Sequence, residues 1–567
     1  MSSQSLPSDT AARPAAQSHL AYEQPQYSRR ETLLTMAGVL MVMLLAALDQ
    51  TIVGTAMPRV IAELQGFNHY AWVTTAYLLS STVTVPIYGR LSDLFGRKPI
   101  FIVGLLIFLL GSGLSGAAQS MNQLIGFRAL QGLGAGALLP IAIAVVGDLF
   151  TPRERARWQG VTGSIFGLAS VVGPTVGGWL TEHTSWRWVF YVNLPIGLIA
   201  LLVLIFLMPT LRGRAKDVRV DYLGAALLVA ATVPLLLALS WAGAEYAWLS
   251  AQVLGCFALA AVSAVSFFFY ESRLERRNGQ PIIEPSLFKN PIFSLSTLIT
   301  VINSMAMFGS IFFLPLFVQG VIGTSITNSG LVITPLMLTL IAGSILSGQL
   351  VAVIGKYKRI AIVGTLISLV GIFLLVRLNL QSTNTDVVIA MVILGFGMGV
   401  GTSLYTLIVQ NALPTKIGQA TSGLTFFRQI GSSVALAAMG SLMNTTYLPA
   451  FQNALPESVK AAVPAQALTA FNNPQILLSP EAQQAVRAQF DAFGAQGSAL
   501  YSSLLEAVKV GLIQGIHSAF LLSFALMLVG LFAVFFLKEI ELRGRGSRAK
   551  AAGNEDAESA TVAAMMH

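Results

Sequence analysis

Residues 89–118 read GRLSDLFGRK PIFIVGLLIFLLGSGLSGAA. The first ten of these residues carry four charged side chains, and the next twenty carry none. An uncharged apolar run of about 20 residues is the length at which an α-helix crosses a hydrocarbon core of about 30 Å. The stretch therefore predicts a membrane-spanning helix that is entered from a polar surface.

The same alternation of apolar and charged segments fills most of the chain. Of its 567 residues, 54% are hydrophobic and only 10% are charged, whereas a soluble domain carries about 25% charged residues. About fourteen apolar blocks of spanning length lie between residues 33 and 537, and only helices satisfy the backbone in a bilayer without closing into a barrel. We therefore predict an all-α polytopic membrane protein.

The basic residues indicate how the chain is oriented. Most of the 34 Lys and Arg residues lie in every second connection between apolar blocks, on the side that also holds both termini. The positive-inside rule places that side in the cytoplasm. Because the positive charge follows the spans and is not gathered on a polar surface with aromatic residues, nucleic-acid binding is excluded.

Two pairs of segments recur at an offset of about 260 residues. Residues 89–97 resemble 348–356, with glycines seven positions apart and a basic residue after the second glycine. Residues 159–163 resemble 419–423. Because each pair has the same orientation, the chain is predicted to contain two parallel repeats of six helices; the alternative is chance similarity between glycine-rich connections.

These patterns divide the chain into two six-helix bundles joined by two linker helices. The segment 444–511 is predicted to be an extracytoplasmic loop, too long for a simple turn. The full division is a disordered cytoplasmic tail at 1–30, an N-terminal six-helix bundle at 31–210, two linker transmembrane helices at 211–289, a C-terminal six-helix bundle at 290–540 and a second disordered cytoplasmic tail at 541–567.

Few charged side chains lie deep inside the predicted spans. Asp49 and Arg128 have matching depths, about 13 Å and 9 Å from the outer ends of their helices at 1.5 Å per residue. A buried charge requires a partner or a wet cavity, so the two are predicted to pair. The pair either exchanges a proton or is a permanent ion pair that orients two helices. With a single cysteine, Cys256, and no deep metal-ligating or nucleophile–base set, neither a metal site nor an enzyme is expected.

Four motifs resemble the major facilitator superfamily, specifically its fourteen-span drug:proton antiporters of the EmrB/QacA type, and the resemblance covers nearly all of residues 31–540. The first motif is Leu48-Asp49-Gln-Thr-Ile-Val-Gly-Thr-Ala-Met-Pro58. The others are the loop 89–98, the segment 128–136 in the fourth span and the segment 167–178 in the fifth. The resemblance implies the major facilitator fold of fourteen spans.

The resemblance also implies roles for individual residues. Asp49 and Arg128 would couple transport to protons. A conformational latch on the cytoplasmic side would comprise Gly89, Asp93, Gly96, Arg97 and Asp148. The antiporter motif of the fifth span would comprise Gly173, Pro174, Gly177 and Gly178, and its smooth surface is expected to form an interface between the halves.

Polar residues in the second half are candidates for a substrate cavity. Each is also a candidate for hydrogen bonding between helices, which is the more common use of such residues in a membrane. These residues are Asn303, Gln319, Tyr405, Gln410, Asn411, Arg428 and Gln429.

The resemblance and the motifs together predict a secondary exporter that couples proton influx to efflux of amphipathic drugs or toxic compounds by alternating access. The alternative is an importer or facilitator of a metabolite such as a sugar or an amino acid. We expect no cofactor beyond the proton-motive force, a monomer in the bacterial cytoplasmic membrane, and small amphipathic substrates. Nothing in the sequence indicates a periplasmic adaptor.

Overall fold

Long helices form because an apolar chain in a bilayer must satisfy its backbone hydrogen bonds within each segment. The computed structural model describes residues 27–64, 70–211, 219–243, 245–323, 326–462 and 494–540, with isolated residues 468, 471, 484, 487 and 490. No β-strand occurs in these ranges. The prediction of an all-α protein is confirmed.

The N-terminal half consists of seven helical segments, in which α6 and α7 are one helix interrupted at Val192. They are α1 (Arg29–Leu64), α2 (Tyr70–Phe95), α3 (Arg97–Gly116), α4 (Met121–Leu149), α5 (Pro152–His183), α6 (Trp188–Tyr191) and α7 (Asn193–Phe206).

The linker hairpin and the C-terminal half follow. The hairpin is α8 (Tyr222–Trp241) and α9 (Ala251–Arg276), and the short helix η2 (Pro285–Lys289) leads out of it. The C-terminal half contains α10 (Pro291–Phe317), η3 (Val318–Ile322), α11 (Ile326–Ile354), α12 (Lys358–Val376), α13 (Asn384–Ala412), α14 (Ile417–Ala454), α15 (Glu457–Ala462) and α18 (Gly494–Phe535).

Twelve helices in the described ranges are long and apolar enough to cross a membrane. Two further helices, α2 and α14, have the length but are less apolar. Together they give the fourteen spans that the sequence predicts. Both α2 and α14 line the contact between the two halves, which explains why they carry more polar residues than the helices around them.

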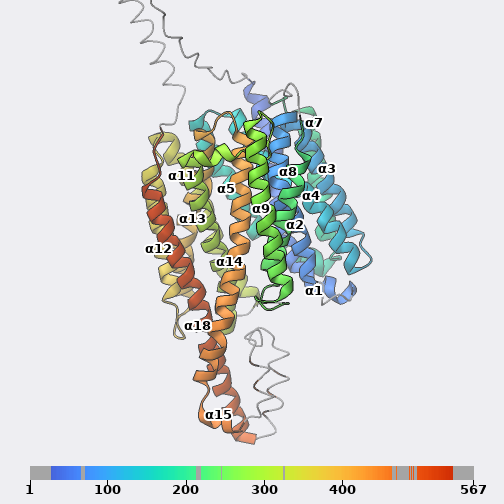
Figure 1. Ribbon diagram of the computed structural model, residues 1–567. Helices are drawn as coiled ribbons and strands as arrows, with labels where there is room; N and C mark the ends of the chain where they lie inside the picture. Colours follow the sequence, from blue (N-terminus) through green and yellow to red (C-terminus); the bar gives the residue numbers. More distant parts are fainter. Residues whose placement is uncertain are drawn as a thin grey trace, which may run out of the picture.

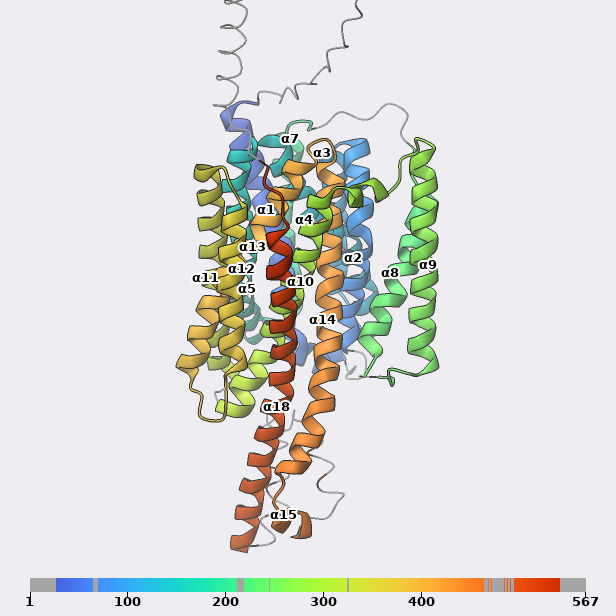
Figure 2. The same ribbon diagram turned by 60° about the vertical axis from the view of Figure 1, so that its left-hand side comes forward.

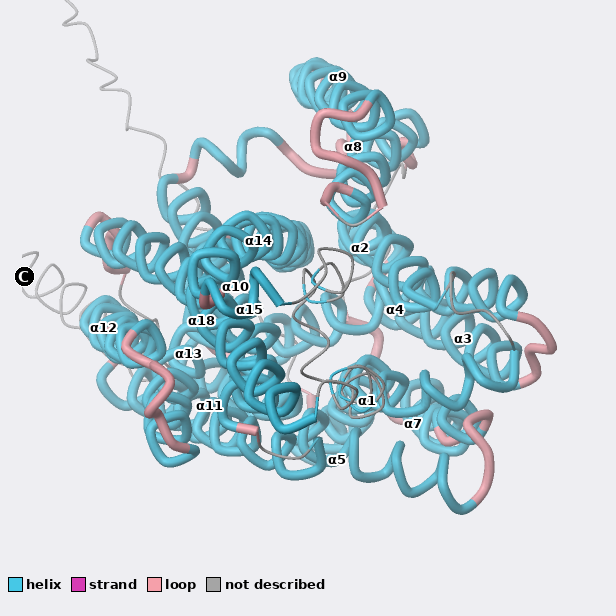
Figure 3. Tube along the Cα trace, turned by 90° about the horizontal axis from the view of Figure 1, so that it is seen from below, coloured by secondary structure: helices cyan, strands magenta, loops and turns pink. Residues whose placement is uncertain are grey.

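The long axes of the helices run roughly parallel to one another, and the helices form one bundle (Figure 1). The first helix begins and the last helix ends at the same face, here named the terminal face (Figures 1 and 2). The α8–α9 hairpin stands at the rim of the bundle beside α2, outside both halves (Figure 3). Its outer surface is apolar and exposed, as expected of helices that face lipid.

Helices α14 and α18 extend well beyond the bundle at the face opposite the termini (Figure 2). The ends of the segment 444–511 are therefore helical and continue α14 and α18, a difference from the predicted loop. Hydropathy falls after residue 443, but an apolar seam continues: Tyr447 and Phe451 are buried in one cluster with Leu504 and Val508. Seam residues four apart keep the two helices paired beyond the bundle.

Candidate functional site

An ion pair lies inside the N-terminal half. Nη1 of Arg128 on α4 is 2.8 Å from Oδ2 of Asp49 on α1. The side chain of Asp49 is 0% exposed and that of Arg128 is 2% exposed. The structure thus brings together the two residues that the depth argument paired, and it seals them from both faces of the bundle.

Neutral polar side chains complete the coordination of the Asp49 carboxylate. Its Oδ1 accepts hydrogen bonds from the Gln131 amide at 2.8 Å and from the Asn193 amide at 3.0 Å. The oxygen of Gln131 in turn accepts from Arg128 Nη1 at 2.7 Å. Asn193 also donates to the hydroxyl of Ser112 at 3.0 Å. Helices α1, α4 and α7 therefore meet at one buried carboxylate, and α3 joins this network through Asn193.

Aromatic rings cover the guanidinium of Arg128. Its Cζ lies 4.1 Å from the ring centroid of Tyr77 on α2 and 5.6 Å from that of Phe190 on α6. Such cation–π contacts attract a desolvated guanidinium by about 2 kcal/mol. Within the described residues, Arg128 Nε has no hydrogen-bond partner. The guanidinium therefore keeps favourable neighbours even when its carboxylate changes charge.

Glycines on α4 explain how Tyr77 comes so close to Arg128. A Cβ at Gly132 would meet the Tyr77 backbone and the Ser80 hydroxyl, and one at Gly136 would lie 2.6 Å from the Ser81 carbonyl oxygen. The spacing of four residues places both glycines on the face of α4 that packs against α2. The fourth-span motif thus supplies Arg128 and also the glycines that let α2 approach closely enough to place the Tyr77 ring over its guanidinium.

The fifth-span motif packs beside the same site. Gly173 on α5 lies against the Thr51 side chain, two residues after Asp49, and Gly177 lies against Thr55. The Thr51 hydroxyl donates to the Ala169 carbonyl at 3.0 Å. These glycines therefore join α5 to α1 within one half.

The expected interface between halves is formed by the earlier part of α5. Gly163 lies against Ser344 and Gly167 against Ile341, both on α11. Ten residues separate Gly163 from Gly173, which at about 100° per residue turns the helix face by roughly 80° from one pair of glycines to the other. Pro174 is exposed, and nothing lies within 4 Å of a Cβ at Gly178.

A charged cluster joins the halves at the terminal face, between α2 and α14. Nη2 of Arg97 pairs with Asp93 at 2.7 Å, and its Nε pairs with Asp148 at 2.7 Å. The second oxygen of Asp93 accepts from the Gln419 backbone N–H at 3.0 Å, in the first turn of α14. An anion at a helix N-terminus is stabilised by the unpaired N–H groups there.

Glycines make this cluster possible. Gly96 has a φ of 93°, a left-handed conformation that glycine tolerates, and it precedes α3. Gly89 on α2 packs against Ser422 of α14, and a side chain at Gly418 would strike Asp93 and Arg97. All five residues predicted for the latch therefore lie at or beside one contact.

A second contact joins α5 to α11 at the same face through glycine and serine residues. A Cβ at Gly348 would lie against the Ala156 carbonyl, and the Ser344 hydroxyl donates to the Gly160 carbonyl at 3.2 Å. Gly355, which follows α11, has a φ of 74°. Gly348 and Gly355 thus repeat the positions of Gly89 and Gly96 in the other half.

Comparison with known proteins assigns the family. Residues 39–436 match the model of the Major Facilitator Superfamily. The chain belongs to the Major Facilitator Superfamily. It is 40% identical over 555 residues to the Multidrug transporter protein MdtP of Bacillus subtilis, covering 95% of this chain and 98% of that protein. Multidrug resistance protein 3 of the same organism is 37% identical over 418 residues, covering 73% and 80%.

A more distant relative and a solved structure agree with this assignment. Efflux pump FUS6 of Gibberella fujikuroi is 29% identical, with 94% of each chain covered. The proton:xylose symporter XylE has the same fold, with a TM-score of 0.56 at 12% identity, over 91% of this chain and 98% of that one. The chain is accordingly a multi-pass membrane transporter of this superfamily and not an enzyme.

The residues predicted for a substrate cavity differ in how deeply they are buried and in what they contact. Gln410 is 0% exposed and donates to the Ile143 carbonyl at 3.2 Å, so it belongs to the closed contact between halves. Tyr405 is buried in an apolar cluster. The half-buried members of the set are Asn303, Gln319, Asn411, Arg428 and Gln429.

Three residues of the buried site are not predicted from the sequence to belong to it: Gln131, Asn193 and Tyr77. Gln131 lies inside the fourth-span motif, one turn after Arg128, which is a usable signal. Asn193 is the one amide in the apolar stretch 188–206, which singles it out in principle. Tyr77 gives no such signal, because aromatic residues are common in spans.

Proposed function

We propose that this chain exports amphipathic compounds in exchange for protons, and that Asp49 carries the proton. The observation that supports this most strongly is the complete burial of the Asp49 carboxylate against Arg128. A charge at the bilayer centre costs at least about 2.5–3.5 kcal/mol on insertion scales. Such a group is retained where it pairs or where it carries an ion along the transport path.

Protonation of Asp49 removes its negative charge and with it the attraction to Arg128. The guanidinium then remains hydrogen-bonded to Gln131 and covered by the rings of Tyr77 and Phe190. Because side chains of α4 and α7 hold this carboxylate of α1, its change of charge alters the contacts among these three helices. That change is the step at which proton binding biases the equilibrium between two conformations.

Alternating access requires that the contact at the terminal face opens. In this structure the face is closed by α2 against α14 and by α5 against α11. We place this face in the cytoplasm, since most Lys and Arg residues outside the spans lie there. The closed state then corresponds to release of substrate on the opposite side, where a proton enters.

The substrates are proposed to be neutral or acidic amphiphiles. The names of the two Bacillus relatives indicate multidrug transport by those proteins. The Arg428 side chain is half-buried on α14, and within the described residues its guanidinium has no hydrogen-bond or ion-pair partner. A free cation in that position disfavours a second cation. We propose that the monomer works with the proton-motive force alone.

Transport by Asp49→Asn in proteoliposomes tests the coupling. With an imposed pH gradient, wild-type protein drives substrate against its concentration gradient, and Asp49→Asn does not, while its substrate binding is retained. Glu63→Gln is the matched control, because Glu63 lies on the same helix but is exposed beyond the span. Unchanged gradient-driven transport by Asp49→Asn overturns the assignment.

The direction of proton movement distinguishes export from the alternative. Antiport moves protons and substrate in opposite directions, so substrate efflux acidifies the compartment it leaves. If protons move in the same direction as the substrate, the protein takes up a metabolite together with protons and is not an exporter. Substrate movement with no proton movement would indicate a facilitator.

The orientation is tested separately by cysteine labelling. In a Cys256→Ala background the chain has no cysteine, so one new cysteine at Ser382 or at Ser286 reports one face. An impermeant thiol reagent added to intact cells should label the cysteine at Ser382 but not the one at Ser286. The opposite pattern reverses the proposed topology.

A further inference from the structure

Two carboxyl groups outside the site described above meet at the terminal end of the linker hairpin. Asp221 caps α8: its Oδ1 accepts from the Gly224 N–H at 2.8 Å and from the Tyr270 hydroxyl at 3.1 Å. Glu271 lies near the end of α9, one residue after Tyr270. A Cβ at Gly224 would strike an oxygen of each carboxyl group, so both oxygens lie over the same glycine.

The side chain of Glu271 has an environment that an ionised carboxylate does not tolerate well. It is 0% exposed, and neither of its oxygens has a hydrogen-bond partner of normal geometry within the described residues. Oδ2 of Asp221, which faces it, also lacks one. Two buried carboxylates that share a site cannot both be ionised without a large electrostatic cost.

Nearby charged groups do not neutralise the pair. Arg90 on α2 is the basic group that acts on Glu271, but its Nη1 is 3.6 Å from Glu284. It also donates to the Gln419 side chain at 2.7 Å in the amide orientation that satisfies both groups. Lys416 is engaged with Glu284, and Arg97 with Asp93. The two groups that do face the pair, the Tyr270 hydroxyl toward Asp221 and the Ile282 backbone toward Glu271, are neutral.

A metal ion is a poor occupant for this position. Hard cations such as Ca²⁺ take six to eight oxygen ligands, whereas two carboxyl groups supply four oxygens at most. Among the described residues no group of three or more His, Cys, Asp or Glu side chains is arranged to hold a metal ion. A proton needs just two oxygens, one to carry it and one to accept its hydrogen bond.

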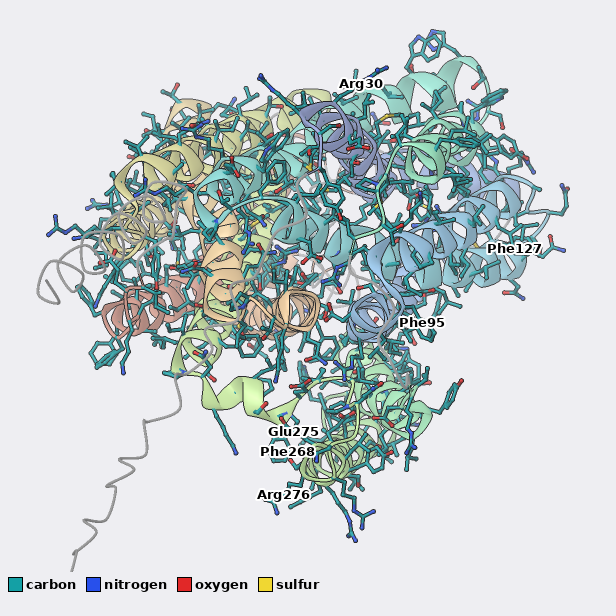
Figure 4. All side chains as sticks on the ribbon, turned by 90° about the horizontal axis from the view of Figure 1, so that it is seen from above. Arg30, Phe95, Phe127, Phe268, Glu275 and Arg276 are labelled. Carbon is teal, nitrogen blue, oxygen red and sulfur yellow. The ribbon has the colours of Figure 1, made fainter. Side chains whose placement is uncertain are left out.

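We propose that Asp221 and Glu271 form a second proton-binding site, in which the two carboxyl groups share one proton. The site lies where the linker hairpin meets α2, next to the contact that closes the terminal face. Figure 4 looks down on this face, with Phe268, Glu275 and Arg276 marking α9 at the rim and Phe95 marking the end of α2.

The position of Arg90 links this proton to the conformation of the transporter, a step that rests on the proposed export function. When the proton leaves to water at the terminal face, the pair becomes doubly negative and attracts the Arg90 guanidinium. Arg90 then withdraws from Glu284 and from Gln419 on α14. Loss of those contacts weakens the α2–α14 closure, so proton release at this face favours its opening.

Infrared spectroscopy of the purified full-length protein tests the shared proton directly. At neutral pH, the carbonyl band of a protonated carboxyl group should be present in wild-type protein and absent in Glu271→Gln. Asp221→Asn keeps a good helix cap and should shift the band, because the acceptor of the proton's hydrogen bond has changed. Glu275→Gln, one turn further along α9 with its carboxylate bonded to Ser286, should leave the band unchanged.

Each other outcome of the infrared experiment contradicts the proposal. Identical spectra for wild type and Glu271→Gln mean that the pair is ionised. A band that Asp221→Asn leaves untouched means that Glu271 holds its proton alone. If Na⁺, K⁺ or Ca²⁺ raises the thermal midpoint of wild-type protein but not of Glu271→Gln, the pair is a cation site. If Glu271→Gln does not fold, the infrared spectrum of Asp221→Asn tests the proposal: a shifted carbonyl band supports a shared proton, and an unshifted band contradicts it.

Transport separates this proposal from the function of Asp49. When the terminal face is at low pH, Glu271→Gln should drive efflux at the rate of wild-type protein. When that face is alkaline, the rate of Glu271→Gln should fall several-fold below that of wild type, because its opening step no longer responds to proton release. Asp49→Asn should lose coupling at every pH and keep the infrared band. A Glu271→Gln profile that matches that of Glu275→Gln overturns the role in opening, whatever the result for Asp49.

Discussion

The two halves of the molecule use the same helix packing around different centres. In the N-terminal half, a Cβ at Gly111 on α3 would lie 2.5 Å from the backbone of Gln131 on α4. In the C-terminal half, a Cβ at Gly371 on α12 would lie 2.6 Å from the backbone of Leu394 on α13. These contacts set the register between the halves, so Gln131 corresponds to Leu394.

With this register, the residue that corresponds to Arg128 is Met391. Met391 and Leu394 are both 0% exposed inside a large apolar cluster of the C-terminal half. The same glycine-mediated packing therefore accommodates either a charged network or an apolar core. Because packing does not require the charges, the ion pair of the N-terminal half is retained for another purpose, which supports its proposed role in proton coupling.

Exchange of the charged residue for its apolar counterpart should have the largest effect. Arg128→Met leaves the Asp49 carboxylate buried without its cation, which costs about 3–5 kcal/mol of stability when one partner of a buried pair is removed. Gradient-driven efflux should be lost. Thermal unfolding in detergent and efflux from proteoliposomes measure the two effects.

Two variants sharpen this prediction. Met391→Leu, the control in the other half, should cost under about 1.5 kcal/mol and keep transport. The double variant Asp49→Asn/Arg128→Met should recover stability relative to Arg128→Met while remaining uncoupled. An Arg128→Met protein that transports normally would show that the pair only orients the helices.

The register itself is tested by the glycines that define it. Gly111→Ala and Gly371→Ala each push a methyl group into a backbone that cannot move cheaply, so each should destabilise its half by about 1–3 kcal/mol. The two losses should be similar, because the contacts are equivalent. Gly126→Ala on α4, where a Cβ meets nothing within 4 Å, is the control. A large loss for one glycine and none for the other would contradict the correspondence.

A smaller effect is expected when one neutral polar group of the centre is exchanged. Gln131→Leu removes a hydrogen bond to the Asp49 carboxylate and another to Arg128, at a cost of about 1–3 kcal/mol. The reverse exchange, Leu394→Gln, buries an amide without partners and should cost a similar amount. Thermal unfolding of both variants measures this. A Gln131→Leu protein as stable as wild type would mean that Asp49 does not need the amide.

The sequence is sufficient to predict the all-helical membrane fold and the pairing of Asp49 with Arg128, because charge in an apolar span is rare and depth along a helix follows from residue number. The left-handed glycines Gly96 and Gly355 likewise occupy matching places in the repeated motif. Rotation of a helix about its axis is much harder to predict. It decides that Asn193 reaches Asp49 and that Gly173 faces α1.

Hydropathy also hides structure outside the membrane. The extensions of α14 and α18 lie beyond the predicted spans because a pair of helices in water needs only one apolar seam. The Asp221–Glu271 pair is hidden for another reason. The two residues are 50 positions apart at the ends of the hairpin, where charged residues are ordinary, and only the folded hairpin shows that they share a buried site.

The smallest effect is expected where the halves differ at the face opposite the termini. There the N-terminal half is closed by Glu63, which accepts from the Trp186 indole at 2.9 Å and pairs with Arg187, whereas the C-terminal half extends as the α14–α18 pair. The Arg187 guanidinium lowers the pKa of Glu63. A carboxyl group with a lowered folded-state pKa stabilises the protein above its ordinary pKa of about 4.3 and loses that contribution as pH falls.

Glu63→Gln should therefore lower the free energy of unfolding at neutral pH by no more than about 1 kcal/mol, because the pair is partly exposed. The difference from wild type should vanish in acid, once Glu63 is protonated, and should shrink in high salt. Thermal unfolding of both proteins across pH measures this. A difference that persists in acid would mean that Glu63 acts through packing against Trp186 and not through its charge.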